Sequence, residues 1–197
     1  MKTVIVKYPA GNVQSIVFAL ERIGLQSIIS DKKEAIQGAD KVIIPGVGEA
    51  RSAMEYFRKT GLDQLIPNLK QPVLGICLGM QLLCLHSEEN NTPCLGIFDL
   101  PVKKFVPSDD SMLKVPHMGW NKLFNTQGVL FKEIEKDTYQ YFVHSYYVPL
   151  SLHTTALSEY FLPYSAALQK DNFYALQFHP EKSGKQGQRI IHSFLKL

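Results

Sequence analysis

The length, composition and charge of this chain favour a globular protein and exclude several kinds of partner. Its 197 residues, 45% of them hydrophobic, are enough to bury a substantial core, and no linker is visible in the sequence, so we expect one domain over residues 1–197. The formal net charge is only +3 and the basic residues are scattered, which makes nucleic acids and membrane surfaces poor candidate partners.

The N-terminal segment predicts a strand followed by a helix. The strand is predicted at residues 3–6, and its three apolar residues, Val4, Ile5 and Val6, are followed by Lys7. This apolar run is too short for a signal-peptide core or a membrane span. We therefore expect a cytosolic protein. Asn12 can cap the helix that follows, and Gly24 can end it. The helix has one apolar stripe, formed by Val13, Ile16, Val17, Leu20 and Ile23.

Strands and helices then alternate through the first half of the chain. Short apolar strands are predicted at residues 26–30, 42–44 and 73–76, and an amphipathic helix at residues 50–59 crosses between the last two. This alternation is typical of an α/β fold with an open, mostly parallel central sheet and helices on both of its faces.

The second half of the chain is richer in predicted strands. They are expected at residues 102–105, 139–148, 154–160, 166–169 and 173–178. Asp171 and Asn172 indicate a hairpin turn before the last of them, so antiparallel strands should extend the central sheet. A closing helix at residues 187–197 is predicted from the helical spacing of Ile190, Ile191, Phe194 and Leu195.

A cysteine lies where the strand at residues 73–76 meets the next helix, which is predicted to run through residues 80–85. Cys77 is flanked by Gly75 and Gly79, as a nucleophile is in a sharp strand-to-helix turn that leaves no room for neighbouring side chains. The N-terminus of the helix would favour a thiolate. We expect Cys77 to be a nucleophile; the alternative is a small buried hydrophobic side chain.

A candidate base and its orienting group follow the last predicted strand, in the sequence Gln177-Phe178-His179-Pro180-Glu181. A nucleophilic cysteine needs a base, and the base needs a partner that fixes its tautomer. His179 can take the thiol proton and Glu181 can hold the imidazole, because alternate side chains of an extended segment share one face. On its own the tripeptide would be an ordinary surface turn, but with Cys77 it predicts a Cys-His-Glu triad.

A glycine loop, Pro45-Gly46-Val47-Gly48, follows the strand at residues 42–44. An oxyanion hole needs two backbone N–H donors close to the developing charge, and backbone without bulky side chains can approach that closely. We assign these donors to Leu78 and to Val47 and Gly48. A phosphate-binding loop is the alternative, but neither phosphate-binding glycine pattern is completed. All three groups follow strands, and sites in open α/β sheets form at the carboxyl ends of strands.

Together these residues resemble the class I glutamine amidotransferase family. The resemblance rests on Cys77 in Gly-Ile-Cys-Leu-Gly-Met-Gln, on the distant His179-Pro-Glu181 and on the glycine loop, and it runs from Tyr8 to the C-terminus. The block Pro-His-Met-Gly-Trp-Asn at residues 116–121 resembles one branch of the family, the glutaminase subunits of imidazole glycerol phosphate synthases. The resemblance implies hydrolysis of the glutamine side-chain amide through a cysteine thioester.

The resemblance also implies substrate-binding residues. Gln81, one helical turn after the cysteine, and Glu89, whose carboxylate suits an α-ammonium group, match family positions that bind glutamine. His144, Ser145 and Tyr146 match a segment that binds the α-carboxylate end of glutamine. A partly exposed helix residue is the alternative for Gln81, and ordinary packing is the alternative for the aromatic strand.

A partner subunit is implied as well, because ammonia released into water at neutral pH becomes ammonium, which is not a nucleophile. The resemblance implies a (β/α)8 cyclase that receives ammonia through a channel and makes imidazole glycerol phosphate and AICAR in histidine biosynthesis. A glutaminase subunit of a different synthase is the runner-up. Trp120 could be an interface anchor or a core aromatic. The interface candidates are Asn12, Met118, Trp120, Asn121 and Lys182.

No metal or cofactor is expected. The chain has no C-x-x-C motif and no histidine pair at ligand spacing. Cys77 and Cys84 are expected on one helix, about 10 Å apart and so too far apart to form a disulfide, and Cys94 is expected in a loop. No role is assigned to three other histidines, His86, His153 and His192.

Overall fold

The computed structural model describes residues 1–9, 13–107 and 113–197, and in this part of the chain the largest sheet has seven strands in the order β11-β12-β13-β4-β3-β1-β2. The parallel strands are β1 (Thr3–Val6), β2 (Ser27–Ser30), β3 (Lys41–Ile44), β4 (Val73–Ile76) and β13 (Phe173–Leu176). β12 (Leu162–Lys170) and β11 (Thr154–Tyr160) continue the sheet in antiparallel pairing. The predicted mostly parallel sheet with an antiparallel extension is confirmed.

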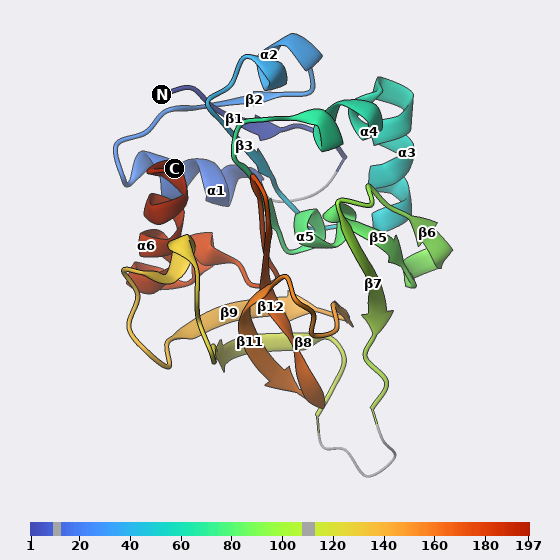
Figure 1. Cartoon of the computed structure of the whole chain (residues 1–197), viewed down its shortest axis with the longest axis vertical. Coiled ribbons are helices and arrows are strands. Elements are labelled where there is room, and N and C mark those ends of the chain that lie inside the picture. Colours follow the sequence, from blue (N-terminus) through green and yellow to red (C-terminus); the bar gives the residue numbers. More distant parts are fainter. Residues whose placement is uncertain (10–12, 108–112) are drawn as a thin grey trace.

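Helices cover both faces of this sheet (Figure 1). One face packs against α1 (Val13–Glu21) and α6 (Gly184–Leu195); the other packs against α2 (Lys33–Gln37), α3 (Ala50–Thr60), α4 (Leu62–Leu65) and α5 (Leu78–Leu83). Successive residues of β1 point to opposite faces of the sheet. Ile5 packs in the core beside α1 and α6, and Val4 and Val6 pack in the core on the other face. Strands buried on both faces need apolar residues at every position, which explains the continuous apolar runs in the sequence.

Helix α3 illustrates how local sequence signals place the helices. Glu49 precedes the helix, and its carboxylate accepts a hydrogen bond of 2.8 Å from the backbone N–H of Ser52. Gly61 ends the helix in the left-handed conformation, with φ of 70°. Ala53, Met54 and Phe57 are buried at helical spacing between these two ends, so the amphipathic helix predicted there is confirmed.

Two smaller sheets lie outside the central one, and here the prediction is wrong. Residues 102–105 and 139–148 were expected to extend the central sheet. They belong instead to a sheet of order β10-β7-β5-β6 and to the pair β8-β9. The strands are β5 (Cys84–Ser87), β6 (Thr92–Pro93), β7 (Phe98–Lys104), β8 (His117–Lys122), β9 (Tyr139–His144) and β10 (Tyr146–Tyr147). Strand character was read correctly, but pairing between distant segments is not encoded in local propensity.

The helix after Cys77 is also shorter than the sequence indicated. It ends at Leu83, and Cys84 opens strand β5, so the two cysteines do not share a helix. The Cys84 carbonyl accepts a hydrogen bond of 2.8 Å from the backbone N–H of Gly96, and Leu85 is 48% exposed. Pairing with the following segment therefore overrides the helix propensity of this run. All three cysteines are free.

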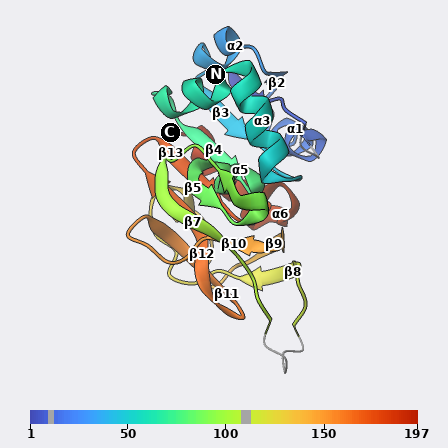
Figure 2. The same cartoon turned by 90° about the vertical axis from the view of Figure 1, so that its right-hand side faces the viewer.

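The second sheet lies beside α5, which leads directly into it (Figure 2). Four short 3-10 helices complete the described elements, namely η1 (Ile66–Asn68), η2 (Glu89–Asn91), η3 (Val129–Phe131) and η4 (Pro180–Lys182). The hairpin turn predicted at Asp171 and Asn172 joins β12 to β13. Across the described residues, every helix is too short or too polar to cross a lipid bilayer.

Candidate active site

Cys77 lies in a tight turn between β4 and α5. Its backbone has φ of 52° and ψ of −107°, a conformation that non-glycine residues rarely adopt and that costs about 1–3 kcal/mol. A Cβ atom on Gly79 would lie 2.1 Å from the backbone oxygen of Ile44, and one on Gly75 would lie 2.7 Å from the backbone of Gly79. The flanking glycines therefore permit the close packing of β3, β4 and α5 that holds the cysteine at the strand end.

His179 and Glu181 lie together at the end of β13. The Nδ1 atom of His179 is 2.7 Å from Oε1 of Glu181, and both side chains are only 3% exposed. A carboxylate only accepts, so Nδ1 carries the hydrogen and the second ring nitrogen, Nε2, is left to accept a proton. The turn is held by two further contacts, because the His179 N–H donates to the Tyr141 carbonyl (2.8 Å) and the Ser183 hydroxyl donates to the His179 carbonyl (2.6 Å).

The environment favours the protonated form of His179. Burial alone would lower the pKa of His179, but the Cys77 sulfur and the Glu181 carboxylate both raise it, and the net pKa is about 10. Nε2 makes no hydrogen bond to a described polar group other than this sulfur interaction. The His179 ring can therefore take and hold the proton of the Cys77 thiol when the sulfur attacks a carbonyl carbon.

A cavity of about 280 Å³ opens at Cys77. Every residue predicted for oxyanion or substrate contact lines it; these are Val47, Gly48, Leu78, Gln81, Glu89, His144, Ser145 and Tyr146. His179 and Glu181 are buried and do not line it. Pro116 and Val143 also line it and were not predicted. The Val143 carbonyl accepts a contact of 3.5 Å from the Cys77 sulfur, and only the tertiary fold reveals that role.

The glycine loop lies against the start of α5. A Cβ atom on Gly46 would lie 2.4 Å from the Gly79 nitrogen and 2.6 Å from the Leu78 nitrogen, so the loop backbone and these amides are in direct contact. Gly48 has φ of 138°, which favours glycine. The loop begins at Pro45, whose carbonyl accepts a hydrogen bond from the buried Tyr8 hydroxyl. The sequence did not single out Tyr8 for this role.

The predicted substrate contacts are held by further polar partners. The Gln81 side-chain amide donates to the Gln177 side chain (3.1 Å) and to the Tyr146 carbonyl (3.4 Å), while Gln177 also donates to the Cys77 sulfur (3.7 Å). Gln177 is fully buried. Its place two residues before His179 was the signal that could have identified it. Glu89 accepts a hydrogen bond of 2.7 Å from the Ala50 N–H, and partial burial raises its pKa.

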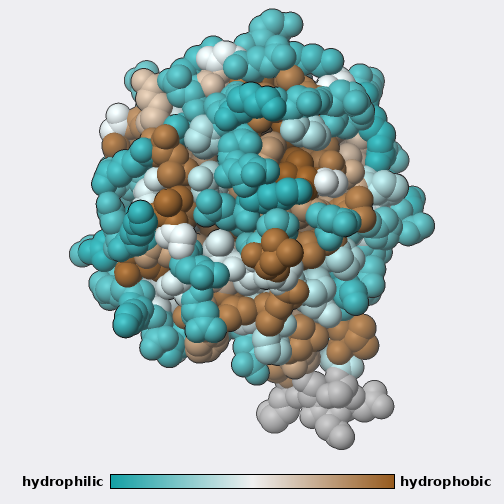
Figure 3. Space-filling view, in the orientation of Figure 1, coloured by the Kyte–Doolittle hydropathy of each residue, from teal (hydrophilic) through white to brown (hydrophobic). Residues whose placement is uncertain are grey.

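Strand β8 carries most of the predicted interface residues. Met118 and Trp120 are 63% and 56% exposed, so the alternative that Trp120 is a core aromatic is wrong. Asn121 is partly buried, and Lys182 is exposed. Asn12 lies outside the described residues. Apolar side chains gather over the lower half of the face seen in Figure 3, the half in which Figure 1 places β8, β9 and β11.

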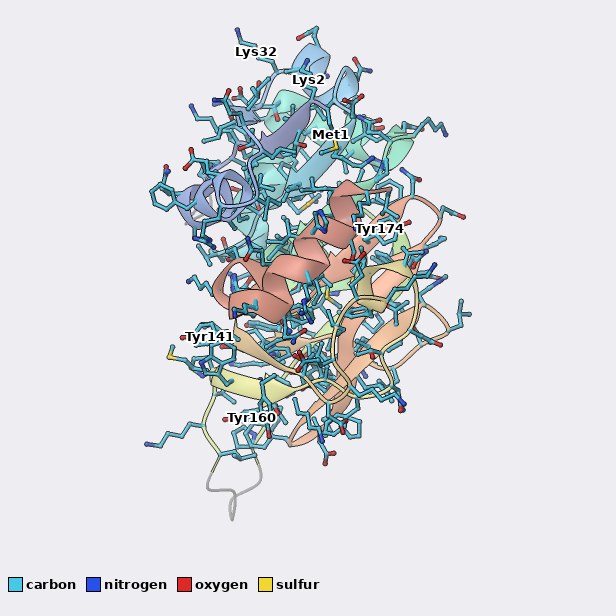
Figure 4. The ribbon with its side chains drawn as sticks, turned by 90° about the vertical axis from the view of Figure 1, so that its left-hand side faces the viewer. Met1, Lys2, Lys32, Tyr141, Tyr160 and Tyr174 are labelled. Atoms are coloured by element: carbon cyan, nitrogen blue, oxygen red, sulfur yellow. The ribbon has the colours of Figure 1, made fainter. Side chains whose placement is uncertain are left out.

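A shallow groove of about 570 Å³ adjoins this part of β8 and includes Met118, Trp120 and Tyr160 in its lining. Figure 4 shows Tyr141 and Tyr160 beside β8 and β9, below helix α6. The Trp120 and Tyr141 rings pack edge to face, 6.0 Å apart. Among the described residues, no cluster of three or more His, Cys, Asp and Glu side chains is arranged to hold a metal ion.

This fold and site define a class I glutamine amidotransferase. Residues 4–197 match the family described as "Glutamine amidotransferase class-I", and the chain belongs to that family. Similar relatives are named imidazole glycerol phosphate synthase subunit HisH. The relative from Bacteroides thetaiotaomicron is 56% identical over 197 residues, and the relative from Pectobacterium atrosepticum is 45% identical over 199; in both comparisons 100% of each chain is covered.

Solved structures show the same fold at low sequence identity. One crystal structure of a glutamine amidotransferase matches with a TM-score of 0.75 and 20% identity, covering 98% of this chain and 97% of the other. A glutamine amidotransferase from Thermotoga maritima matches with a TM-score of 0.63 and 16% identity, covering 99% and 82%. These structures support the fold assignment alone.

Proposed function

We propose that the chain is the glutaminase subunit of an imidazole glycerol phosphate synthase, acting in histidine biosynthesis as one cytosolic domain over residues 1–197. The observation that carries this proposal is the buried His179–Glu181 pair, 2.7 Å apart, next to the strained turn of Cys77 at the cavity. The names of relatives 44–56% identical over the full chain support the choice of synthase.

In this function the Cys77 thiol gives its proton to His179, and the sulfur attacks the carboxamide carbon of glutamine. The N–H groups of Leu78 and of the Val47–Gly48 segment stabilise the tetrahedral oxyanion, and His179 gives its proton to the departing ammonia. A thioester remains on the cysteine sulfur. His179 then takes a proton from water, whose oxygen attacks the thioester carbon, and glutamate leaves as the thiolate is restored. Glu181 keeps the imidazole in the tautomer that both steps require.

The cavity lining supplies chemistry that suits glutamine. The Glu89 carboxylate can bind the α-ammonium group, and Gln81 can bind beside the nucleophile. His144, Ser145 and Tyr146 form the wall where the α-carboxylate end would lie. These contacts hold the substrate so that its side-chain amide, and no other carbonyl group, meets Cys77.

The ammonia product requires a partner, which we propose is a (β/α)8 cyclase that binds the outer face of β8. Met118 and Trp120 project from that face, and exposed aromatic residues are frequent interface anchors. Asn12, Asn121 and Lys182 remain the other proposed contacts. A glutaminase subunit of a different synthase is the alternative, and co-purification with a barrel cyclase would decide between them.

The test compares Cys77→Ser with Cys94→Ser in the complex with the cyclase. Cys77→Ser should lower glutamine-dependent synthesis by on the order of 10³ or more, because the hydroxyl is a far weaker nucleophile. It should leave ammonia-dependent synthesis at alkaline pH unchanged. Cys94 lies outside the cavity, so Cys94→Ser should retain both activities. Full glutamine-dependent turnover by Cys77→Ser would refute the assignment.

A further inference from the structure

A chain of hydrogen bonds connects strand β8 with the wall of the cavity. The Asn121 side-chain amide is 3.4 Å from Nε2 of His117, Nδ1 of His117 is 3.1 Å from Nε2 of His144, and Nδ1 of His144 is 2.7 Å from the Tyr146 carbonyl. His117 and His144 are only 4% and 5% exposed. The triad chemistry uses neither ring, and only His144 was predicted from the sequence.

The direction of this chain is fixed from the cavity end. The Tyr146 carbonyl can only accept, so Nδ1 of His144 must carry its hydrogen. In a neutral ring the other nitrogen, Nε2, is then an acceptor. His117 must therefore donate to it from Nδ1, which leaves Nε2 of His117 as an acceptor in turn.

The direction is fixed independently from the β8 end. The Lys122 backbone N–H donates to the Asn121 side-chain oxygen (2.8 Å), so the Asn121 nitrogen is the donor atom. It donates to the Glu159 carbonyl (2.8 Å) and points to Nε2 of His117. Both ends of this hydrogen-bond chain thus give the same donor-to-acceptor direction, from Asn121 through the two rings to Tyr146. At each end the direction is set by a hydrogen bond to a backbone group.

Packing and electrostatics keep both rings neutral and in place. The His117 ring stacks on Tyr160 at 4.0 Å and on Phe142 at 5.1 Å. Burial lowers the pKa of His117 to about 4; burial and nearby His117 and His179 lower the pKa of His144 to about 3. Protonating either ring would also place two N–H groups against each other, so the hydrogen-bond geometry disfavours the charged form of both rings.

We propose that His117 is a positioning residue for glutamine hydrolysis, which holds His144 in one tautomer and thereby fixes the cavity wall at residues 143–146. The inference rests on the proposed function. That wall contacts the nucleophile and a proposed substrate-binding residue directly, because the Val143 carbonyl accepts from the Cys77 thiol and the Tyr146 carbonyl accepts from Gln81. A displaced wall weakens substrate binding without removing the nucleophile, its base or the oxyanion donors.

Two substitutions separate the hydrogen bond from the ring packing. His117→Phe keeps an aromatic ring between Tyr160 and Phe142 but leaves Nε2 of His144 without a donor. His117→Asn loses the stacking but can place an amide N–H near the position of Nδ1. In the complex with the cyclase, His117→Phe should raise the KM for glutamine roughly tenfold, equivalent to about 1.4 kcal/mol, with kcat changed by less than about threefold. His117→Asn should recover most of the lost affinity.

The control is His192→Asn, which alters an exposed histidine of α6 that faces Glu133 and should leave KM unchanged. The second measurement is independent of activity: nitrogen-15 NMR of the histidine-labelled chain at pH 7 should show His117 and His144 as neutral Nδ1–H tautomers. In His117→Phe, the nitrogen-15 chemical shift of His144 Nε2 should move towards the value of a ring nitrogen that accepts no hydrogen bond.

Three results would overturn the inference: a wild-type KM in His117→Phe, an equal loss in His117→Asn, or an Nε2–H tautomer or imidazolium at His144. Failure of the proposed function is distinct, since it would appear as a wild-type complex that does not hydrolyse glutamine at all, while the spectrum would still report the tautomers. If the wild-type complex is active and any of the three results is observed, only the role proposed for His117 is refuted.

Discussion

At the scale of single residues, the site depends on groups that hold strained backbone in place. Cys77 has a positive φ of 52° and persists only because its neighbours fix it. Its N–H donates to the Leu176 carbonyl (2.7 Å) of the adjacent strand. On the other side, the Tyr8 hydroxyl binds the Pro45 carbonyl and anchors the start of the glycine loop. Groups outside the cavity lining therefore help to hold the backbone that carries the proposed oxyanion donors.

Tyr8→Phe tests this anchor. The change leaves the Pro45 carbonyl without its buried donor, so the free energy of unfolding should fall by about 1–3 kcal/mol, measured by urea denaturation. Glutamine turnover in the complex should also fall, because the loop that carries Val47 and Gly48 loses its anchor. Tyr174→Phe is the matched control, since Tyr174 packs against Phe194 of α6 on the other face of the sheet. Equal effects of the two changes would argue against a specific role for Tyr8.

At the scale of elements, strand β8 presents two different faces. Met118 and Trp120 are exposed on its outer face, and His117 is buried on its inner face, as the alternation of a strand requires. β8 pairs with β9 along its whole length, from His117 opposite His144 to Lys122 opposite Tyr139. One strand thus joins the proposed partner surface to the cavity wall through its two sides.

Trp120→Ala tests the outer face. If Trp120 anchors the cyclase, the dissociation constant measured by titration calorimetry should rise by about 30-fold or more, equivalent to about 2 kcal/mol, as for interface hot spots. Ile28→Ala is the control, because Ile28 is 46% exposed on β2, at the edge of the central sheet opposite β11. An unchanged dissociation constant for Trp120→Ala would remove this residue from the interface.

At the scale of the whole molecule, stability is tied to buried groups that must stay neutral. The central sheet separates two hydrophobic cores. The core beside α1 and α6 contains aromatic side chains that pack around His117 and His144. The titratable groups facing His117 and His144 are each other, Tyr160, Tyr164 and His179. None of these supplies a carboxylate that would stabilise an imidazolium there.

The free energy of unfolding should therefore fall as the pH is lowered from about 6.5 towards 4. The folded-state pKa values of His117 and His144 are about 4 and 3, below the value of 6.5 for an unfolded histidine, so in this window the unfolded chain binds protons that the folded chain does not. The stability that depends on these two histidines being neutral is fully present above pH 6.5, and it is lost as the pH falls towards and through their folded-state pKa values. Each histidine contributes a slope of up to about 1.4 kcal/mol per pH unit.

His117→Asn should reduce the slope of the free energy of unfolding against pH by the contribution of about one proton. The slope is measured by urea denaturation at pH values between 4.5 and 7.5. The exposed His192 on α6 provides the control, and His192→Asn should retain the wild-type slope. A wild-type slope in His117→Asn would mean that His117 is protonated in the folded protein.

The sequence by itself determined the parts that depend on neighbouring residues. The glycines around Cys77 and the spacing of His179 and Glu181 predicted a turn and a hydrogen-bonded pair, because local sterics and strand alternation leave few other arrangements. The apolar runs of the parallel strands and the cap and stop signals of α3 were readable for the same reason. Local periodicity carried enough information to define the α/β class.

Only the tertiary structure decided which distant segments meet. Cys84 opens a strand because it pairs with a later segment, and residues 139–148 leave the central sheet for partners that local propensity does not specify. Tyr8 meets Pro45 across 37 positions, and Gln177 meets Cys77 across 100. The His117–His144 contact spans 27. A buried polar group takes the partner that the fold brings to it, and that partner has no signal in its own neighbourhood of the chain.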